Sequence, residues 1–302
     1  MEQPILVLMG PTAVGKTELS LAIAQELGAE IISVDSRQIY KGLDIGTAKP
    51  EAAERQLVRH HFIDELDPSQ HLSAGRFAEA ANQRIAEIYG RSKTPLVVGG
   101  STLYLSALLH GISQIPATDP EVRTALTDRL NRAGAATLYR ELEQVDPISA
   151  GTMDATKSQR IVRALEVYYS TGRPISSFHA RKEGPKYEFI PVVLTRDRAA
   201  LYGLINARVD LMLDLGLVRE VEQLLEQGYS PTLPALRSIG YGEIIRFLQG
   251  EIPKDEAVNL IKRNSRRYAK RQLTWFRRYE EYRWLDLDSG IVSVEYIISL
   301  LQ

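Results

Sequence analysis

The chain has 302 residues, of which 44% are hydrophobic and 25% charged, the composition of an ordinary globular protein. These values exclude disorder, collagen and coiled coil as the main architecture, and the length predicts two domains or one domain with an insertion. Because the chain has no cysteine, disulfides, thiolate metal sites and cysteine catalysis are excluded, and we expect a cytoplasmic protein.

The first 110 residues alternate short apolar runs with amphipathic stretches, which is typical of a parallel α/β sheet. Apolar residues recur every four positions over 16–27 and Gly28 follows them, so we predict a helix there. The apolar run at 5–9 is too short for a signal peptide or a membrane span, and we expect no membrane association. The predicted strands of this region are 4–9, 30–35 and 94–99.

A glycine-rich segment connects the first predicted strand to the first predicted helix and fits the pattern G-x-x-x-x-G-K-[ST]. Glycines let backbone N–H groups close on phosphate oxygens, while Lys16 supplies a cation and Thr17 a hydroxyl for Mg²⁺. A fortuitous glycine-rich turn is the alternative. The phosphate-binding residues are expected to be Gly10, Pro11, Thr12, Ala13, Val14, Gly15, Lys16 and Thr17.

A carboxylate is predicted at the end of the second strand. A kinase or triphosphatase places a second acid after a later strand to hold Mg²⁺, but the strand at 94–99 is followed by Gly100 and Ser101. Asp35 ends the strand before it, and strand carboxyl ends border the ligand crevice. Asp35 is therefore either a general base or the N-cap of the segment that follows.

Helical patterns replace the strand patterns between residues 115 and 187, as at 121–131 and 158–170, before a strand returns at 189–195. We therefore predict a P-loop NTPase-like α/β core, a parallel sheet with helices on both faces, together with a helical insertion domain. The core comprises 1–114 and 188–302, including basic C-terminal helices, and the insertion 115–187.

Positive charge is concentrated near the C-terminus, although the whole chain has a formal net charge of -1. Residues 262–283 contain nine basic and two acidic residues. Lys262, Arg266 and Lys270 are spaced by four, as are three arginines one position later, so a helix would carry them as one basic stripe. Such a stripe is either a solvated face or a nucleic-acid contact.

Six blocks of the sequence closely resemble the bacterial type of tRNA dimethylallyltransferases. The nineteen-residue block that ends at Pro50 is far more specific than a phosphate loop alone, and the order of the blocks is also that of the family. The likeness spans almost the whole chain, at 10–17, 32–50, 60–64, 98–104, 159–167 and 237–241.

The resemblance implies a reaction and its partners. A dimethylallyl group would pass from dimethylallyl diphosphate to N6 of the adenosine 3′-adjacent to the anticodon, in tRNAs that read codons beginning with U. A diphosphate leaving group needs no acid to position a hydrolytic water, so the missing second acid is expected. The implied partners are the tRNA anticodon stem-loop and dimethylallyl diphosphate, the implied cofactor is Mg²⁺, and we expect a monomer.

The resemblance also implies residue roles. Asp35 would be the general base, while Lys16 and Mg²⁺ bound by Thr17 would stabilise the departing diphosphate. Ser101 takes the place of a family threonine whose hydroxyl holds the target base, with a helix N-cap as its alternative. Arg208 is a candidate for a further cation on the diphosphate, although Leu204 departs from the family pattern nearby. Lys49 lines the channel or is merely solvated.

The target adenine must leave its stack, which requires a grip on the flanking RNA. For Arg160 and Arg163 the residues alone favour a salt-bridged surface, and the resemblance favours RNA. The positions expected to contact tRNA are Asp35, Ser36, Arg37, Gln38, Ser101, Arg123, Gln159, Arg160, Ile161, Val162, Arg163, Arg237, Ser238, Ile239, Gly240, Tyr241, Gly242, Arg266 and Arg267.

Competing interpretations remain open from the residues. His60 and His61 are expected to be structural rather than metal ligands, because adjacent strand side chains face opposite ways. A prenyl transferase acting on free adenine nucleotides would share the phosphate loop but would need neither the insertion nor the basic stripe. A small-molecule kinase would lack its second acid, and a non-catalytic RNA-binding protein would leave the loop and Asp35 unexplained.

Overall fold

The computed structural model describes residues 3–111, 113, 115–116, 118–178 and 184–301. The chain divides into two compact units, one formed by Met1–His110 and Pro185–Gln302 and the other by Gly111–Gly184. These limits lie within a few residues of the predicted ones. No helix in the described part of the chain is both long and apolar enough to cross a membrane.

The larger unit is built on a six-stranded sheet in the order β3-β2-β4-β1-β5-β6, and all its neighbouring strands are parallel. The prediction of a parallel α/β sheet is thereby confirmed. β6 was not predicted, because only Leu285 of its four residues is buried and its sequence carries no run of apolar residues. The strands are β1 (Ile5–Met9), β2 (Ala29–Val34), β3 (His60–His61), β4 (Thr94–Gly99), β5 (Phe189–Thr195) and β6 (Arg283–Asp286).

Both faces of the sheet are covered by helices, as predicted. Alternate side chains of β1 enter different cores, with Ile5, Val7 and Met9 in one and Leu6 and Leu8 in the other. The first core is completed mainly by α3 (Ala74–Gly90), α4 (Thr102–His110), α10 (Leu217–Glu226), α11 (Tyr241–Leu248) and α12 (Lys254–Phe276). The second is completed mainly by α1 (Lys16–Leu27), α9 (Arg198–Asp214) and α13 (Val294–Ser299), and the short α2 (Ala52–Leu57) buries no residue.

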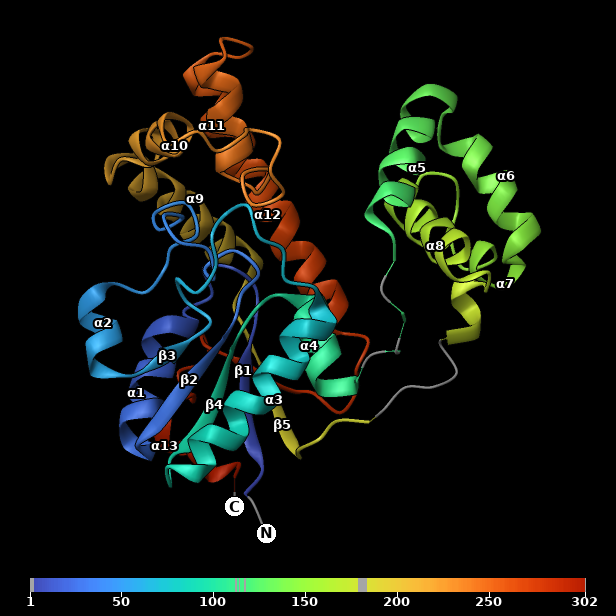
Figure 1. Cartoon of the computed structure of the whole chain (residues 1–302). Helices are drawn as coiled ribbons and strands as arrows, with labels where there is room; N and C mark the ends of the chain where they lie inside the picture. The colour runs from blue at the N-terminus through green and yellow to red at the C-terminus, as the bar shows by residue number, and fades with distance from the viewer. Residues whose placement is uncertain (1–2, 112, 114, 117, 179–183, 302) are drawn as a thin grey trace. The chain divides into compact units, whose positions relative to one another are not determined.

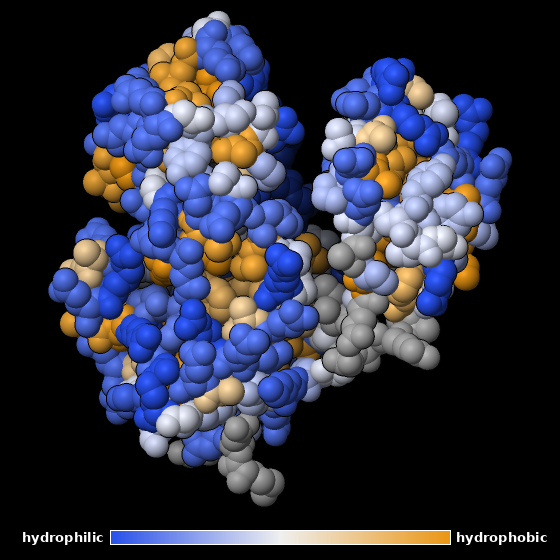
Figure 2. Space-filling model, in the orientation of Figure 1, coloured by the Kyte–Doolittle hydropathy of each residue, from blue (hydrophilic) through white to orange (hydrophobic). Residues whose placement is uncertain are grey.

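Helices α9, α10, α11 and α12 rise from the carboxyl edge of the sheet, where the loops after the strands also lie (Figure 1). The face drawn in Figure 2 is largely hydrophilic, and apolar side chains of this unit gather between these helices and the sheet. Ligands of open parallel sheets bind at this carboxyl edge. A ligand site is therefore expected at the loops after β1, β2 and β4.

The smaller unit is helical, as predicted, with its own apolar core. Asp119 caps α5 by accepting a hydrogen bond from the backbone N–H of Glu121, and Pro120 occupies the first turn, a favourable start for a helix. Leu138 and Leu142, four positions apart, present one face of α6 to this core. The elements are α5 (Pro120–Ala133), α6 (Ala135–Val145), α7 (Pro147–Ala150), α8 (Ser158–Thr171) and η1 (Ile175–Phe178).

Candidate active site

The predicted phosphate loop connects β1 to α1, so its backbone N–H groups meet the N-terminus of a twelve-residue helix. Gly15 has φ +111°, a conformation that side chains rarely adopt, and a Cβ on Gly10 would lie 2.7 Å from the Leu194 carbonyl oxygen. Both glycines are therefore required by the path of the chain. The geometry is that of an anion-binding turn at a helix N-terminus.

Lys16 is held against the loop by two backbone carbonyls. Its Nζ donates to the oxygens of Gly10 at 3.0 Å and Pro11 at 2.8 Å. Burial, and then the nearby Arg208 guanidinium, lower the pKa of Lys16 to about 7, while Asp35 acts in the opposite direction. A bound anion would restore the charged form, so this lysine is suited to holding a polyanionic ligand.

Arg208 reaches the loop from α9, a distant segment of the chain. Its Nη1 donates to Thr12 Oγ1 at 3.4 Å, and burial lowers its pKa while Asp35 raises it. Lys16 and Arg208 thus both reach the phosphate loop, and Asp35 lines the same cavity. The predicted contact of Arg208 to a diphosphate stays a prediction, and its side chain lines the cavity of the phosphate loop.

Asp35 directly follows β2 and holds the next turn. Its Oδ1 accepts from the backbone N–H groups of Arg37 at 2.7 Å and Gln38 at 3.2 Å, the contacts expected of a cap. Among the described residues no donor is hydrogen-bonded to Oδ2. The carboxylate is therefore fixed through one oxygen while the other is available, so the capping and general-base interpretations are compatible.

Two cavities meet at these residues, one of about 350 Å³ and one of about 440 Å³. The larger contains the phosphate loop with Lys16 and Thr17. The smaller has a largely apolar wall formed by Ile205, Val209, Met212, Ile239 and Ile261. Six residues line both cavities, namely Thr12, Ala13, Asp35, Thr47, Arg208 and Tyr268.

Gln272 of α12, which the sequence did not single out, joins the two strand ends that form the site. Its Oε1 accepts from the Thr12 N–H at 3.0 Å, and its Nε2 donates to the Gly100 carbonyl at 2.7 Å. The side chain is 2% exposed. Gln272 therefore fixes the phosphate loop against the turn that precedes α4.

Ser101 lies at that turn. Its carbonyl accepts from the Leu105 N–H at 2.9 Å, so it occupies the N-cap position of α4 by its backbone. Its hydroxyl is hydrogen-bonded to no described residue, and the residue lines neither cavity. The expected contact to the target base stays a prediction.

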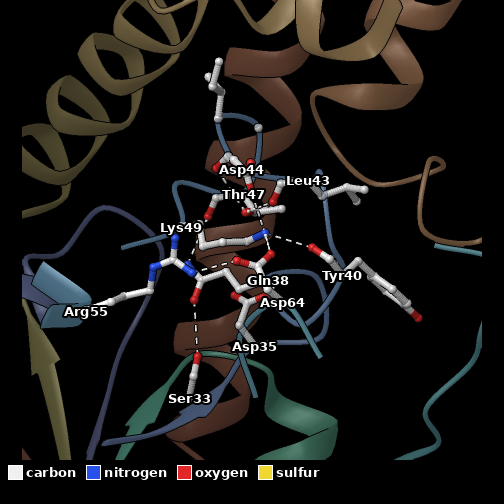
Figure 3. A network of polar contacts seen from close by, with 12 residues as sticks. Ser33, Asp35, Gln38, Tyr40, Leu43, Asp44, Thr47, Lys49, Arg55 and Asp64 are labelled. Carbon is white, nitrogen blue, oxygen red and sulfur yellow. Dashed lines mark hydrogen bonds and ion pairs between the residues drawn. The ribbon is translucent and has the colours of Figure 1, made fainter. Parts of the chain in front are cut away.

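The segment between Asp35 and Pro50 is held by a polar network (Figure 3). Gln38 Nε2 donates to the carbonyls of Thr47 and Ala48 at 3.2 and 3.1 Å. Lys49 Nζ contacts Asp44 Oδ1 and Asp64 Oδ1, both at 2.5 Å. The interpretation of Lys49 as solvated is wrong, since its side chain is only 2% exposed and its charge is neutralised by two carboxylates. Its place along a channel stays a prediction.

Glu220 of α10 anchors the same segment from the other side. Its carboxylate accepts from the backbone N–H groups of residues 44, 45 and 46 at 2.7 to 3.1 Å, and from the Tyr241 hydroxyl at 2.6 Å. Burial, followed by the Glu220 charge, raises the pKa of Tyr241. The Tyr241 side chain is 0% exposed, so it is not available as the tRNA contact that the resemblance implied.

The other residues of the larger unit that were expected to contact tRNA differ in their exposure and in the cavity that they line. Arg237 is exposed, and Ser36, Arg37, Ser238 and Ile239 line the apolar cavity. Gly240 is buried and also lines that cavity, whereas Gly242 lines a separate groove.

Both histidines form hydrogen bonds within the protein, and His60 also lines the cavity of the phosphate loop. His61 Nε2 lies 2.7 Å from Glu30 Oε2, and Arg91 donates to the same carboxylate at 2.8 Å. His60 Nδ1 contacts the Val58 carbonyl at 2.8 Å, and burial lowers its pKa. In the described part of the chain no group of three His, Asp or Glu side chains is placed to hold a metal ion.

Of the residues in the helical unit that were expected to contact tRNA, some are exposed, and the others are buried or form ion pairs. Gln159 and Arg160 are exposed, whereas Ile161 and Val162 are buried in the core of the unit and cannot present their side chains to RNA. Arg123 and Arg163 each place Nη1 3.3 Å from Glu166 Oε2, so both take part in an ion pair. Glu166 is buried and accepts in addition from Thr118 at 2.6 Å.

Gln272, Glu220 and Glu166 are functional or supporting residues that sequence reasoning missed. The hydrogen-bond partners of each residue are brought to it by the tertiary fold, so they cannot be identified from the sequence. The only local signal was polarity at a position that helical periodicity assigns to the buried face.

Comparisons with known proteins agree on one family. The model of the family described as IPP transferase matches residues 38–279. The tRNA dimethylallyltransferase of Salinibacter ruber is 53% identical over 282 residues, which cover 93% of this chain and 87% of that protein. That of Desulforudis audaxviator is 44% identical over 286 residues, covering 94% and 92%.

Two solved structures are similar in fold. The full-length tRNA isopentenylpyrophosphate transferase of Bacillus halodurans has a TM-score of 0.72 at 37% identity, covering 99% of this chain and 95% of that one. A eukaryotic dimethylallyltransferase described as acting on tRNA has a TM-score of 0.78 at 28% identity, covering 94% and 74%.

Proposed function

This chain belongs to the IPP transferase family, and we propose that it is a tRNA dimethylallyltransferase. The group transferred is dimethylallyl, the donor is dimethylallyl diphosphate, and the acceptor is N6 of the adenosine 3′-adjacent to the anticodon in tRNAs that read codons beginning with U. The observation that carries the proposal is the meeting of an anion-binding loop, an apolar cavity and the Asp35 carboxylate at one place.

The diphosphate is the ligand that the loop supports best. Backbone N–H groups at the start of α1, Lys16 and Arg208 supply positive charge, which stabilises the developing charge on the departing diphosphate. Mg²⁺ would add Lewis-acid stabilisation of that charge. Thr17 provides a hydroxyl toward the same cavity, and the remaining oxygen ligands would come from the diphosphate and water.

Asp35 acts as the general base. As the adenine N6 forms its bond to the allylic carbon, the carbon–oxygen bond to the diphosphate breaks and the electron pair leaves on the diphosphate oxygen. The N6 proton passes to Asp35 Oδ2, while Oδ1 keeps its contacts to Arg37 and Gln38 and holds the carboxylate in place. The five-carbon group is accommodated by the apolar wall that begins with Ile205 and Val209.

RNA recognition requires a surface around this cavity. Ser36, Arg37, Arg237 and Ser238 line the apolar cavity that would receive the target base, and Gln38 lines the cavity of the phosphate loop. We keep Ser101, at the turn before α4, as a further contact to the RNA. We assign Gln159 and Arg160 of the helical unit, which are exposed, to the RNA as well. One protein molecule is sufficient to bind one anticodon arm, so we propose that the protein is a monomer. It would act in the cytoplasm, where tRNA is present.

The test is a nucleoside analysis. The protein is incubated with dimethylallyl diphosphate, Mg²⁺ and unmodified tRNA, with a parallel reaction on AMP, and the products are analysed by mass spectrometry. Dimethylallyladenosine in the tRNA alone supports the proposal. Product on AMP alone would instead make the protein a nucleotide prenyl transferase, and no product in either reaction from folded protein would contradict both.

A further inference from the structure

The two cavities of the candidate active site share a boundary at which the bond between the allyl group and the diphosphate would break. The diphosphate is assigned to the phosphate loop and the five-carbon group to the apolar wall, so the reacting carbon would lie among the residues that line both cavities. Because the electron pair leaves with the diphosphate, positive charge develops on the allyl carbons. The boundary therefore needs a group that stabilises a cation.

One of the six shared residues offers such a group. Asp35 is negatively charged, but it is assigned to the N6 proton. Four others carry either a positive charge or a small side chain, namely Thr12, Ala13, Thr47 and Arg208. The sixth is Tyr268 of α12, and in the described part of the chain no other phenylalanine, tyrosine or tryptophan lines either cavity. The face of an aromatic ring carries partial negative charge, which attracts a cation.

The Tyr268 side chain is neutral, and its hydroxyl is unused within the protein. The hydroxyl forms no hydrogen bond with any residue that the structure describes. Burial, followed by the nearby Asp35 charge, raises the pKa of Tyr268. The phenol therefore stays protonated at physiological pH, and the ring can act through its π face.

One cation already lies near this ring from outside the two cavities. The Arg271 guanidinium is 5.7 Å from the centre of the Tyr268 ring. Arg271 is exposed and lines neither of the two cavities. It lines the separate groove formed by residues of α11 and α12, as does Arg267. Water screens its exposed charge, and the part of the ring that lines the cavities stays open to a ligand.

We infer that Tyr268 is a further catalytic residue, whose ring stabilises the positive charge that develops on the allyl carbons during transfer. The inference rests on the proposed function and deepens it, because Lys16 and Arg208 act on the departing anion and Tyr268 on the cation that it leaves. No bond forms to the ring. The allyl carbon bonds to N6, the electron pair stays on the diphosphate oxygen, and the N6 proton passes to Asp35.

The ring would act on the rate rather than on the affinity for the donor. Dimethylallyl diphosphate carries no positive charge on its allyl group before the bond breaks, so the attraction is strong only in the transition state. A ring of this kind attracts a desolvated cation enough to change a rate or a binding constant about five- to thirtyfold.

The first test measures binding and needs no turnover. Calorimetry compares dimethylaminoethyl diphosphate, whose protonated amine places a positive charge where the allyl cation develops, with the saturated isopentyl diphosphate, which has the same shape and no such charge. Tyr268→Leu should weaken binding of the ammonium compound about five- to thirtyfold and that of isopentyl diphosphate less than about twofold. Tyr268→Phe keeps the ring and should bind both compounds within about twofold of the wild type.

The second test is single-turnover transfer to tRNA at saturating donor. Tyr268→Leu should lower the rate about five- to thirtyfold, and Tyr268→Phe should stay within about twofold of the wild type. Tyr202→Leu is the matched control, because Tyr202 lies on the neighbouring α9 with the Arg198 guanidinium 5.2 Å from its ring and lines neither cavity. Its rate should change less than about twofold.

Three results would overturn the inference. They are an equal change in affinity for the two compounds in Tyr268→Leu, a wild-type rate in that variant, and a loss in Tyr268→Phe as large as that in Tyr268→Leu, which would assign the effect to the hydroxyl. If Tyr268→Leu does not fold, phenylalanines with increasing numbers of fluorine atoms replace Tyr268. Each fluorine withdraws charge from the ring face and should weaken binding of the ammonium compound further, and equal affinities along the series would overturn the inference.

The two tests also separate this inference from the proposed function. If the wild-type protein forms dimethylallyladenosine in tRNA and Tyr268→Leu does so at the same rate, only the role of Tyr268 fails. If the ammonium compound discriminates between the variants as expected but the wild-type protein forms no product, the proposed reaction fails and the catalytic role with it, while the ring remains a cation-binding group.

Discussion

Replacing Gln272 by alanine is expected to damage both stability and turnover. The side chain is 2% exposed and bonds the Thr12 N–H at 3.0 Å and the Gly100 carbonyl at 2.7 Å. Gln272→Ala removes both contacts at once. It thereby releases the first turn of the phosphate loop from the turn that carries Ser101.

The size of the effect follows from the burial of these groups. An unsatisfied buried donor or acceptor costs about 1 to 3 kcal/mol. Gln272 also lines the cavity of the phosphate loop, so water can reach part of the space and replace some of the lost bonds. We therefore expect a loss of about 2 to 3 kcal/mol in the free energy of unfolding, below the sum of two full penalties.

The kinetic effect comes from displacement of the loop. A shift of about 1 Å in the reacting groups can reduce a rate about a hundredfold. We expect Gln272→Ala to lower kcat about ten- to a hundredfold and to raise the KM for dimethylallyl diphosphate. Gln272 would thus be a positioning residue, since it acts through the loop rather than on the substrate.

Urea denaturation and steady-state transfer to tRNA, both well below the melting temperature, measure these two effects. Thr274→Ala is the matched control, because Thr274 lies exposed on the same helix, and its unfolding free energy should change by less than about 0.5 kcal/mol. A Gln272→Ala protein with wild-type kcat and KM would refute the positioning role, whatever its stability. Wild-type stability would refute the bonding argument.

Two further results are expected from groups around the loop. Because burial and Arg208 lower the pKa of Lys16 to about 7, its ammonium form is largely lost between pH 6 and pH 8. Calorimetry measures the association constants of wild type and Lys16→Met for inorganic diphosphate, and their ratio should fall about tenfold over that range. A constant ratio would contradict the assignment. Glu220→Ala leaves three backbone N–H groups and the Tyr241 hydroxyl without their acceptor. Urea denaturation should therefore show a loss of about 3 to 5 kcal/mol in the free energy of unfolding. A loss below about 1 kcal/mol would show that water replaces the carboxylate.

The sequence predicted the elements whose signals are local. The helix at Lys16–Leu27 and the strands at Thr94–Gly99 and Phe189–Thr195 have the predicted bounds, because each combines an apolar pattern with a glycine or proline signal nearby. β6 was missed, since Arg283–Asp286 borders the sheet with a single buried residue and gains its structure by pairing with β5. Edge strands of this kind have little sequence signature of their own.

The candidate site was predictable as far as its motifs extended. The phosphate loop follows β1 and Asp35 follows β2. The carboxyl ends of parallel strands lie at one edge of the sheet, so the two are expected close together. Gln272 and Glu220 could not be found in the same way, because the backbone groups that they bond lie more than 150 residues away. Only the fold decides which backbone groups they satisfy.

The surface was the least predictable part. The spacing of Arg266 and Arg267 placed both on one helix, which is confirmed, but the direction in which each cation points depends on the neighbouring helix. α9 engages Arg266 through Asn206, whereas α11 leaves Arg267 open to the groove. Likewise Ile161 and Tyr241 stood within the matched blocks, and the packing of their own helices buried them.

The central claim is that Asp35 removes the adenine proton in a tRNA prenyl transfer, and single-turnover transfer by Asp35→Asn tests it most directly. The asparagine keeps an oxygen for the backbone N–H groups of Arg37 and Gln38, so the turn is preserved while the base is lost. We predict that the rate falls about 10²- to 10⁴-fold while the dissociation constant for tRNA changes less than about threefold. A single-turnover rate within threefold of the wild type, or a loss of tRNA binding as large as the loss of rate, would contradict the account.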